Sequence, residues 1–262
     1  MTEERTLGKS FKGRYPFRLG TTSFIYPDLY SENVRKLGPY LDEIELLFFE
    51  SNHPDSLPDA YEINTLLELK NEFDITYNIH LPTDVVIAAA NPNERKHAID
   101  TLSKVIAMTA ELEPVTFTLH IPYEVYPGGP NVWQAYALKG LATLFENGMD
   151  PSLVSIETLD YSPDLLEETL SRFDVSVCLD IGHLFINGYD PLHYYNKFKE
   201  RVSIIHLHGV ADGCDHLALD QFDDLQREKV RAILKGYAGS LSIEVFSFND
   251  LQTSLDAFDK WI

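Results

Sequence analysis

A buried strand with a polar tip is predicted by the segment Val175-Ser-Val-Cys-Leu-Asp-Ile-Gly-His183. Successive side chains of a strand point to opposite faces, so one face of this strand is aliphatic. The other face carries Ser176, Cys178 and Asp180, and His183 follows just past Gly182. This arrangement is typical of an interior barrel strand that carries metal ligands at its end. The same pattern recurs along the chain, and the recurrence makes a functional interpretation possible.

Eight β-rich runs alternate with eight amphipathic stretches along the 262 residues. The runs cover residues 17–23, 43–50, 75–80, 115–120, 154–158, 175–180, 203–208 and 241–246. The amphipathic stretches lie near 30–39, 59–72, 93–112, 132–146, 163–172, 191–200, 221–236 and 250–261, with helix-cap candidates at Asp59, Asp190 and Asp220. This count predicts an α/β fold, the (β/α)₈ TIM barrel, whose typical size is ~250 residues. We expect residues 1–16 to form an N-terminal arm and residues 17–262 to form a single barrel domain.

An open, doubly wound sheet is the alternative architecture. Sheets of that kind bind dinucleotides through a Gly-rich loop that follows the first strand. In this chain Gly20-Thr-Thr-Ser leads into Phe24-Ile-Tyr-Pro, which is not such a loop. The barrel is therefore the favoured prediction, and a dinucleotide site is not expected.

Histidine, aspartate or glutamate ends each of six consecutive strands. In strands three and four the matching segments Tyr77-Asn-Ile-His-Leu-Pro82 and Phe117-Thr-Leu-His-Ile-Pro122 place a proline two residues after the histidine. The tips of parallel strands meet at the C-terminal rim, where barrel active sites are built. Imidazoles and carboxylates in one concavity predict a site for two or three divalent transition-metal ions, with zinc foremost and manganese, iron or cobalt as alternatives. The candidate ligands are His80, His120, Glu157, Asp180, His183, His206, His216 and Glu244.

Each candidate also has a purely structural interpretation. A single histidine at a strand end is more often a hydrogen-bonded structural residue than a ligand, and Glu157 or Glu244 could be an ion-pair partner inside the barrel. The segment Asp212-Gly-Cys-Asp-His216 is expected to be a loop after strand seven, shaped by turn chemistry. Whether His208, Asp212 or Asp215 joins the site is left open. His53 and His97 are expected on the surface, and His193 is expected on a helix outside the site.

Aromatic residues are frequent in the segments that follow the first, fourth, fifth and sixth strands. They could hold a large flat ligand, or they could simply extend the core at the rim of the barrel. These residues are Phe24, Tyr26, Tyr123, Tyr126, Tyr161, Phe185 and Tyr189.

The charge balance argues against a nucleic-acid partner. The chain has 21 basic and 41 acidic residues, a net charge of −20, whereas binding a phosphate backbone requires clustered Lys and Arg. If the ligand carries phosphate, bound metal must supply positive charge. No apolar run is long enough for a membrane span, no signal-peptide pattern follows Met1, and the two cysteines form no CxxC pair. We therefore expect a cytoplasmic protein with a small-molecule substrate and neither a membrane nor a nucleic-acid partner; the oligomeric state is left open.

The ordered set of tips resembles the xylose-isomerase-like barrel superfamily that includes the family-2 apurinic endonucleases. The resemblance extends over residues 17–250 and rests on His80, His120, Glu157, Asp180-x-x-His183, His206, His216 and Glu244. It implies a cluster of three zinc ions at these tips. After strand seven the endonucleases have Asp-x-His, whereas Asp215 and His216 are adjacent here, which puts the third ion in question.

Further segments are similar to the cobamide-remodelling phosphodiesterases of the CbiR type. They are Leu19-Gly-Thr-Thr-Ser-Phe-Ile-Tyr-Pro27, Asn33-Val-Arg-Lys-Leu37, Asp42-Glu-Ile-Glu-Leu-Leu-Phe-Phe-Glu50, and His206-Leu-His-Gly-Val210 with Asp215-His216-Leu217. This likeness implies cleavage of the nucleotide-loop phosphodiester of a cobamide. On this interpretation the enzyme is a metal-dependent hydrolase with Glu157, Asp180 and Glu244 as catalytic residues, and Glu157 positions or deprotonates the attacking water.

Three other functions compete with the hydrolase. In a sugar or sugar-phosphate isomerase or epimerase of the same superfamily, Glu157, Asp180, one histidine of strand seven and Glu244 would hold one ion, and the two glutamates would move a substrate proton. His80 and His120 together with His183 exceed what one ion needs, which disfavours this alternative, although these histidines could bind sugar hydroxyls. DNA repair is disfavoured by the charge. A non-catalytic cobamide-binding or metal-binding module is the last alternative.

Overall fold

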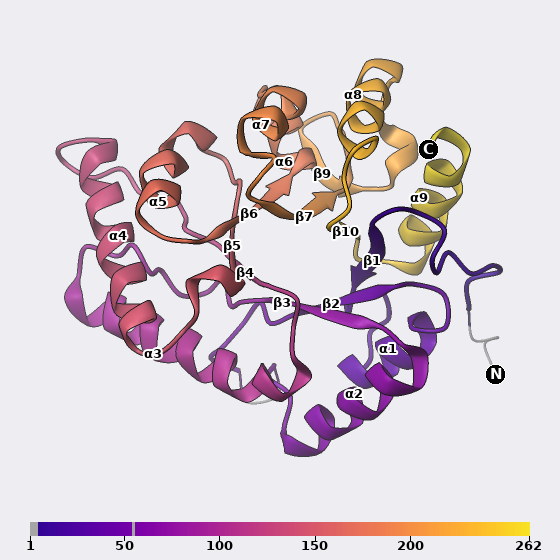
Figure 1. Ribbon diagram of the computed structural model, residues 1–262, viewed down its shortest axis with the longest axis horizontal. Helices are drawn as coiled ribbons and strands as arrows, with labels where there is room; N and C mark the ends of the chain where they lie inside the picture. Colours follow the sequence, from indigo (N-terminus) through magenta and orange to yellow (C-terminus); the bar gives the residue numbers. More distant parts are fainter. Residues whose placement is uncertain (1–4, 54–55) are drawn as a thin grey trace.

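Eight parallel strands close into a barrel in the order β1-β10-β7-β6-β5-β4-β3-β2 (Figure 1). The computed structural model describes residues 5–53 and 56–262. The barrel strands are β1 (Arg18–Thr22), β2 (Glu43–Leu47), β3 (Thr76–His80), β4 (Phe117–Leu119), β5 (Val154–Glu157), β6 (Ser176–Asp180), β7 (Val202–Leu207) and β10 (Ser240–Ile243). The predicted (β/α)₈ barrel is thus confirmed, and the open doubly wound sheet is excluded.

The longer helices surround the barrel, as Figure 1 shows. They are α1 (Tyr30–Leu37), α2 (Ala60–Phe73), α3 (Pro92–Thr109), α4 (Pro130–Glu146), α7 (Pro191–Phe198), α8 (Asp224–Leu234) and α9 (Phe248–Trp261). Two six-residue helices, α5 (Glu167–Arg172) and α6 (Ile181–Ile186), and the 3₁₀ turns η1 (Ala110–Leu112), η2 (Pro151–Leu153), η3 (Pro163–Leu166) and η4 (Leu219–Gln221) complete the connections.

Side-chain caps fix where several of these helices begin. Asp59 accepts a hydrogen bond from the backbone of Glu62 at the start of α2, and Asp190 caps α7, as their positions predict. The predicted cap at Asp220 is wrong, because that residue lies in the turn η4. Asp223 caps α8 instead, in a capping box with Gln226.

A polar layer closes the barrel interior below the strand tips. Glu43 is fully buried and accepts hydrogen bonds from Thr76 (2.7 Å), Ser240 (2.9 Å) and Arg18 (3.2 Å). Burial raises the pKa of this carboxyl. Aliphatic side chains on the outer strand faces pack against the helices, and Leu7 of the N-terminal segment is buried in the same core. The polar layer sets the floor beneath the tip residues.

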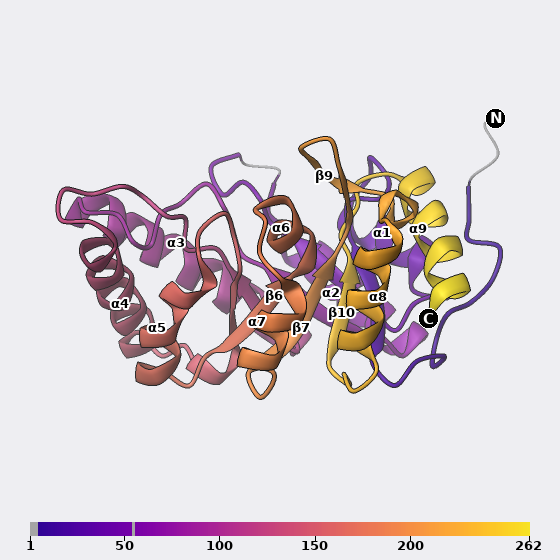
Figure 2. The same ribbon diagram turned by 90° about the horizontal axis from the view of Figure 1, so that it is seen from above.

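Two elements near the strand tips differ from the sequence prediction. Helix α6 begins directly after β6, where a loop was expected to carry His183. The segment after β7 is a hairpin of β8 (Gly209–Ala211) and β9 (Cys214–Leu217), not a loop. Its two corner residues, Asp212 and Gly213, both have positive φ, 52° and 78°, as a type I′ hairpin turn requires. Figure 2 shows α6 and β9 at the same end of the barrel.

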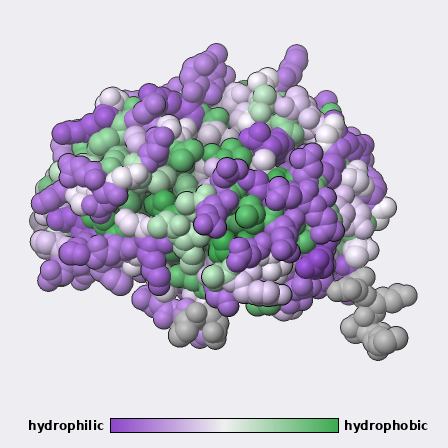
Figure 3. Space-filling model, turned by 60° about the horizontal axis from the view of Figure 1, so that its bottom comes forward, coloured by the Kyte–Doolittle hydropathy of each residue, from purple (hydrophilic) through white to green (hydrophobic). Residues whose placement is uncertain are grey.

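On the face drawn in Figure 3, purple hydrophilic residues surround a central area where green apolar residues are visible. Within the described part of the chain, no helix combines the length and apolarity that crossing a bilayer requires.

Candidate metal centre

The ends of six strands bring histidines and carboxylates to one end of the barrel. His80, Glu157 and Asp180 are the last residues of β3, β5 and β6, and His206 lies in β7. His120 and Glu244 follow β4 and β10. Because the strands are parallel and the barrel is closed, residues far apart in sequence become neighbours here. Among the described residues, several sets have ligand atoms that all lie within 4.8 Å of one another, and three of these sets together contain every predicted metal ligand.

The first set, called the two-histidine group, contains His80, His120 and Glu157. Glu157 Oε2 lies 3.3 Å from His80 Nε2 and 3.0 Å from His120 Nε2. His80 Nδ1 lies 3.0 Å from the carbonyl oxygen of Leu81, an acceptor, so Nδ1 carries the proton and Nε2 is the ligand atom in the neutral ring. Burial acts to lower the pKa of His80, but the carboxylates of Glu157, Glu45 and Glu244 together outweigh burial, and the pKa is raised.

The second set, called the carboxylate group, contains Glu157, Asp180, His206 and Glu244, all buried. His206 Nδ1 lies 3.1 Å from Glu244 Oε2, 3.5 Å from Glu157 Oε2 and 3.9 Å from Asp180 Oδ2. Its other nitrogen, Nε2, lies 2.9 Å from Glu45 Oε1. When Nε2 donates to Glu45, the lone pair of Nδ1 points among three carboxylates, the arrangement in which an outer carboxylate orients a metal-bound histidine.

Two buried atoms of the carboxylate group lack the hydrogen bonds that such atoms ordinarily make. His206 Nδ1 and Glu244 Oε2 are shielded from solvent and have no hydrogen-bond partner within the described structure, although they are 3.1 Å apart. Burial alone would raise the pKa of Glu157, but the nearby His120 and His206 lower it by more than burial raises it. The net pKa is therefore well below its usual range. Unpaired lone pairs on ionised, oxygen-rich and imidazole donors fit a divalent cation.

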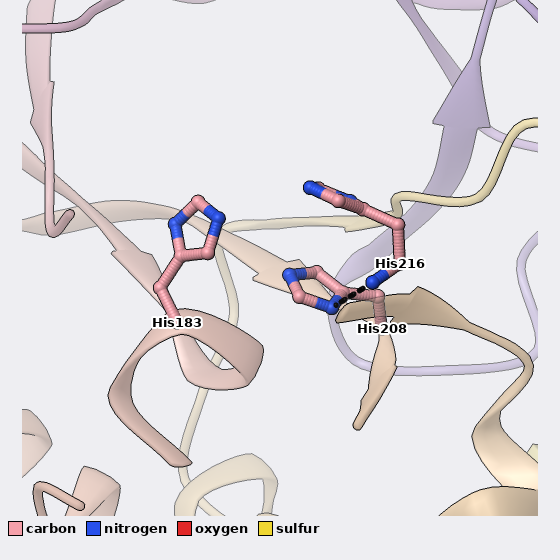
Figure 4. Close-up of side chains that lie close together, drawn as sticks. All are labelled: His183, His208 and His216. Carbon is pink, nitrogen blue, oxygen red and sulfur yellow. Dashed lines mark hydrogen bonds between the residues drawn. The ribbon is translucent and has the colours of Figure 1, made fainter. Parts of the chain in front are cut away.

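The third set, called the three-histidine group, contains His183, His208 and His216, whose rings gather around one space in Figure 4. His183 lies on α6. Asp180 caps the start of this helix, because its carboxylate accepts a hydrogen bond from the His183 backbone (2.7 Å). His208 follows β7, and its Nδ1 accepts a hydrogen bond from the backbone of His216 (2.9 Å), drawn dashed in Figure 4. This bond ties the β8–β9 hairpin to the site.

Glycine at position 182 is needed for this packing. A Cβ there would lie 2.1 to 2.5 Å from ring atoms of His208, closer than real contacts allow.

Burial acts to lower the pKa of His183, but the Asp180 and Glu157 carboxylates raise it to about 10. In the absence of metal this histidine is therefore protonated near neutral pH, and an ion bound there must displace a proton.

The structure assigns different positions to the three residues whose role the sequence leaves open. His208 joins the three-histidine group, and its Nε2 lies 3.1 Å from Asp180 Oδ1. Asp215 lies at the edge, with Oδ2 3.9 Å from His183 Nε2. Asp212 is exposed in the hairpin turn and lies outside the three groups. His53 and His97 are exposed, as predicted, and His193 lies exposed on helix α7, outside the three groups.

Glu45 is the site residue that the sequence prediction missed. It lies on β2, faces the interior and contacts His206, and its Oε2 atom has no hydrogen-bond partner among the described residues. The alternation Glu43-Ile-Glu45 is the signal that could have found it. That signal is masked because Leu46, Leu47 and Phe48 continue the strand as an unbroken apolar run.

Comparison with known proteins places this geometry in a family. The family described as xylose isomerase-like TIM barrel matches residues 32–261. The chain belongs to the xylose isomerase-like TIM barrel family. An inosose dehydratase of Geobacillus thermodenitrificans is 28% identical over 130 residues, which are 48% of this chain and 40% of that protein. The match thus spans less than half of the dehydratase.

Solved structures share the fold over nearly the whole chain. A D-tagatose 3-epimerase-like protein superposes with a TM-score of 0.78 at 20% identity, over 94% of this chain and 97% of that one. Endonuclease IV from Thermus thermophilus gives 0.69 at 17% identity, over 93% and 98%. D-psicose 3-epimerase from Clostridium cellulolyticum gives 0.73 at 14% identity, over 94% and 99%. The named relatives are enzymes of different reaction classes, so the fold alone does not select among them.

Proposed function

We propose that this xylose isomerase-like barrel is a metal-dependent phosphodiester hydrolase. The observation that carries the proposal is the position of Glu157. It belongs to both the two-histidine group and the carboxylate group, and its Oε1 atom lies 3.4 Å from His183 of the third group. A carboxylate shared between adjacent donor sets is suited to bridging two ions, as phosphodiester hydrolysis by paired ions requires.

Each group of residues has a definite part in this proposal. The two-histidine group would hold one ion, the carboxylate group a second, and the three-histidine group a third. When bound, such ions supply the positive charge that neutralises a phosphodiester and acidifies a water. Glu157 would also position the attacking water and take its proton. Asp180 and Glu244 would complete the carboxylate set that holds the reacting region in place.

The chain's own charge explains why ions are needed. The strand tips bring Glu157, Asp180 and Glu244 together in a protein of net charge −20, an environment that repels phosphate. The same charge disfavours DNA as the substrate, despite the shared fold with endonuclease IV, because binding a duplex backbone needs clustered Lys and Arg.

We infer a cobamide as the substrate on narrower grounds. The support is the likeness of the segments at 19–27, 42–50 and 206–210 to the cobamide-remodelling phosphodiesterases. Two of these segments continue past the ends of β1 and β2 to the rim of the barrel beside the donor groups. The inferred reaction is hydrolysis of the nucleotide-loop phosphodiester.

Two measurements test the proposal together. Protein purified without chelator should contain two or three equivalents of transition metal by elemental analysis. Incubation with an adenosylated cobamide should release a riboside detectable by chromatography, and Glu157→Gln should abolish the release. A wild-type protein that carries two ions but releases no riboside would remove the cobamide and leave the hydrolase to be tested with simpler phosphodiesters. Less than one equivalent of metal would overturn the metal-dependent mechanism.

A sugar epimerase is the second candidate, and one observation favours it. The carboxylate group is a complete four-donor site by itself and would hold a single ion without help from the histidines of β3 and β4. Glu157 and Glu244 would then exchange a proton with the sugar carbon. One equivalent of metal, together with exchange of a carbon-bound proton of a ketose in deuterated water, would support the epimerase. His80→Ala should leave the proton exchange unchanged if the protein is the epimerase, and should abolish phosphodiester hydrolysis if it is the hydrolase.

A further inference from the structure

Three phenylalanines form a wall that joins the two-histidine group to the three-histidine group. This aromatic wall consists of Phe24, Phe49 and Phe246. The Phe49 ring stands edge-on to His80 at a centroid distance of 5.6 Å, and the Phe246 ring lies 4.9 Å from that of His216. Phe49 also packs against Phe24 at 5.9 Å and against Phe246 at 6.0 Å. The wall therefore borders the metal-ligand sets directly.

Apolar surface at the wall is left open to solvent. Phe24 is 50% exposed, Phe246 is 39% exposed and the neighbouring Leu29 is 62% exposed. Other rim aromatics are covered by neighbouring rings: Tyr161 packs against Trp133, and Phe185 packs against Phe222. An exposed cluster of large apolar side chains beside a functional site indicates a ligand contact, because burial of such rings stabilises a complex.

A cleft of about 470 Å³ opens behind the wall, between the segments that follow β1 and β2. Its apolar lining includes Phe24, Leu29, Leu47 and Phe49, and its acidic lining includes Asp28 and Glu50. The volume lies in the range of small-ligand sites, which is roughly 300–1,000 Å³. Asp28 forms an ion pair with Lys36 (3.2 Å), and Glu50 adds negative charge to the lining, which disfavours an anionic occupant.

We propose that this cleft is a subsite for a neutral, planar aromatic group carried on the ester arm that stays bonded to phosphorus when the diester is hydrolysed. The proposal rests on the proposed hydrolase function and names the class of substrate. Phe49 is the link, because its ring contacts His80 and it also lines the cleft together with Phe24. With the phosphorus held at the donor groups, an arm that crosses Phe49 reaches Phe24 and Leu29.

The test uses metal-loaded protein and two diesters with the same leaving group. Bis(4-nitrophenyl) phosphate retains an aromatic arm, whereas methyl 4-nitrophenyl phosphate retains a methyl arm. Phe24→Ala should raise KM for the first about three- to tenfold, the value of one aromatic contact, and leave KM for the second within about twofold. Phe24→Leu should fall between wild type and Phe24→Ala. Tyr61→Ala, at a 78% exposed aromatic on α2, is the matched control and should change neither value.

Binding measured by calorimetry separates failure of the subsite from failure of the hydrolase. Wild type should bind phenylphosphonate more tightly than methylphosphonate, and Phe24→Ala should remove the preference. If both diesters are hydrolysed and Phe24→Ala affects them equally, the subsite is overturned and the hydrolase stands. If neither diester is hydrolysed but the phenyl preference depends on Phe24, the hydrolase is overturned and the aromatic site stands. Equal binding of the two phosphonates by wild type would overturn the aromatic site.

Discussion

Glu45→Gln should weaken the binding of one metal ion without removing any proposed ligand. Glu45 lies outside the three donor groups, but its Oε1 atom is 2.9 Å from His206 Nε2, and both side chains are buried. Glutamine keeps the size and one oxygen of the side chain but loses the charge that orients the imidazole and increases its basicity. Changes to such outer partners typically reduce metal affinity about 10- to 100-fold. This range corresponds to about 1.4–2.7 kcal/mol.

The assay is competition with a chromogenic chelator, carried out separately with Zn²⁺ and Mn²⁺. The ion held by the carboxylate group should bind roughly 10- to 100-fold more weakly, the loss typical for a changed partner of a metal-bound histidine. The other ions should bind with unchanged affinity. Urea unfolding of the metal-free variants measures whether the substitution also destabilises the fold.

Glu43→Gln is the matched control. Glu43 is buried on the same strand, two positions earlier, but its partners are Thr76, Ser240 and Arg18 rather than a histidine. It should change stability and leave metal affinity alone. The reasoning is refuted if Glu45→Gln binds every ion within about twofold of wild type, or if the two variants lose affinity equally.

Three further predictions concern the three-histidine group. Gly182→Ala forces a methyl group into the His208 ring and should lower the free energy of unfolding by about 1–3 kcal/mol, measured in urea, and reduce the metal count by one; an unchanged count would contradict the assignment. Gly213→Ala places a side chain at φ 78° and should cost about 1–2 kcal/mol of stability in the same assay, whereas Gly8→Ala, which meets open space, should cost little. Burial lowers but Asp180 and Glu157 raise the pKa of His183, to about 10, so the stabilisation from its charge is present below the unfolded pKa of about 6.5 and is lost as pH rises toward 10. Metal binding at pH 7 should therefore release a proton, seen as a buffer-dependent heat in calorimetry, and apparent affinity should rise with pH; a heat independent of the buffer would count against it.

The barrel could be predicted from the sequence because local signals repeat in register with the fold. Alternation in each short run identifies the inward face, and the spacing of strands and helices identifies closure. The same signals place the candidate ligands at strand tips. The pairing itself is not local: the Thr21 side chain reaches the backbone of Ile243 across 222 residues, and only closure brings β2 opposite β7. That is why the contact of Glu45 with His206 could not be read from either strand alone.

Elements of few residues were the ones that the sequence prediction missed. Helix α6 has six residues, too few for an amphipathic period, and Gly182 within it reads as a helix breaker. A glycine is required at this position because the His208 ring leaves no space for a Cβ atom. The β8–β9 hairpin did carry a local signal, the pair Asp212-Gly213, which is a preferred type I′ turn. The strands on either side are three and four residues long, which conceals the alternation that would have supported it.

Asp180 acts both in the fold and in the proposed site, whereas Phe24 of the aromatic wall belongs to neither the helix cap nor the donor groups. The Asp180 carboxylate begins helix α6 by accepting the His183 backbone hydrogen bond, and it also faces His208 and His206. A change there disturbs the helix and two donor groups together. Phe24, half exposed on the β1 side of the rim, lies outside the donor groups. Substitutions at Phe24 can therefore alter the proposed ligand contacts without changing any residue of the three donor groups.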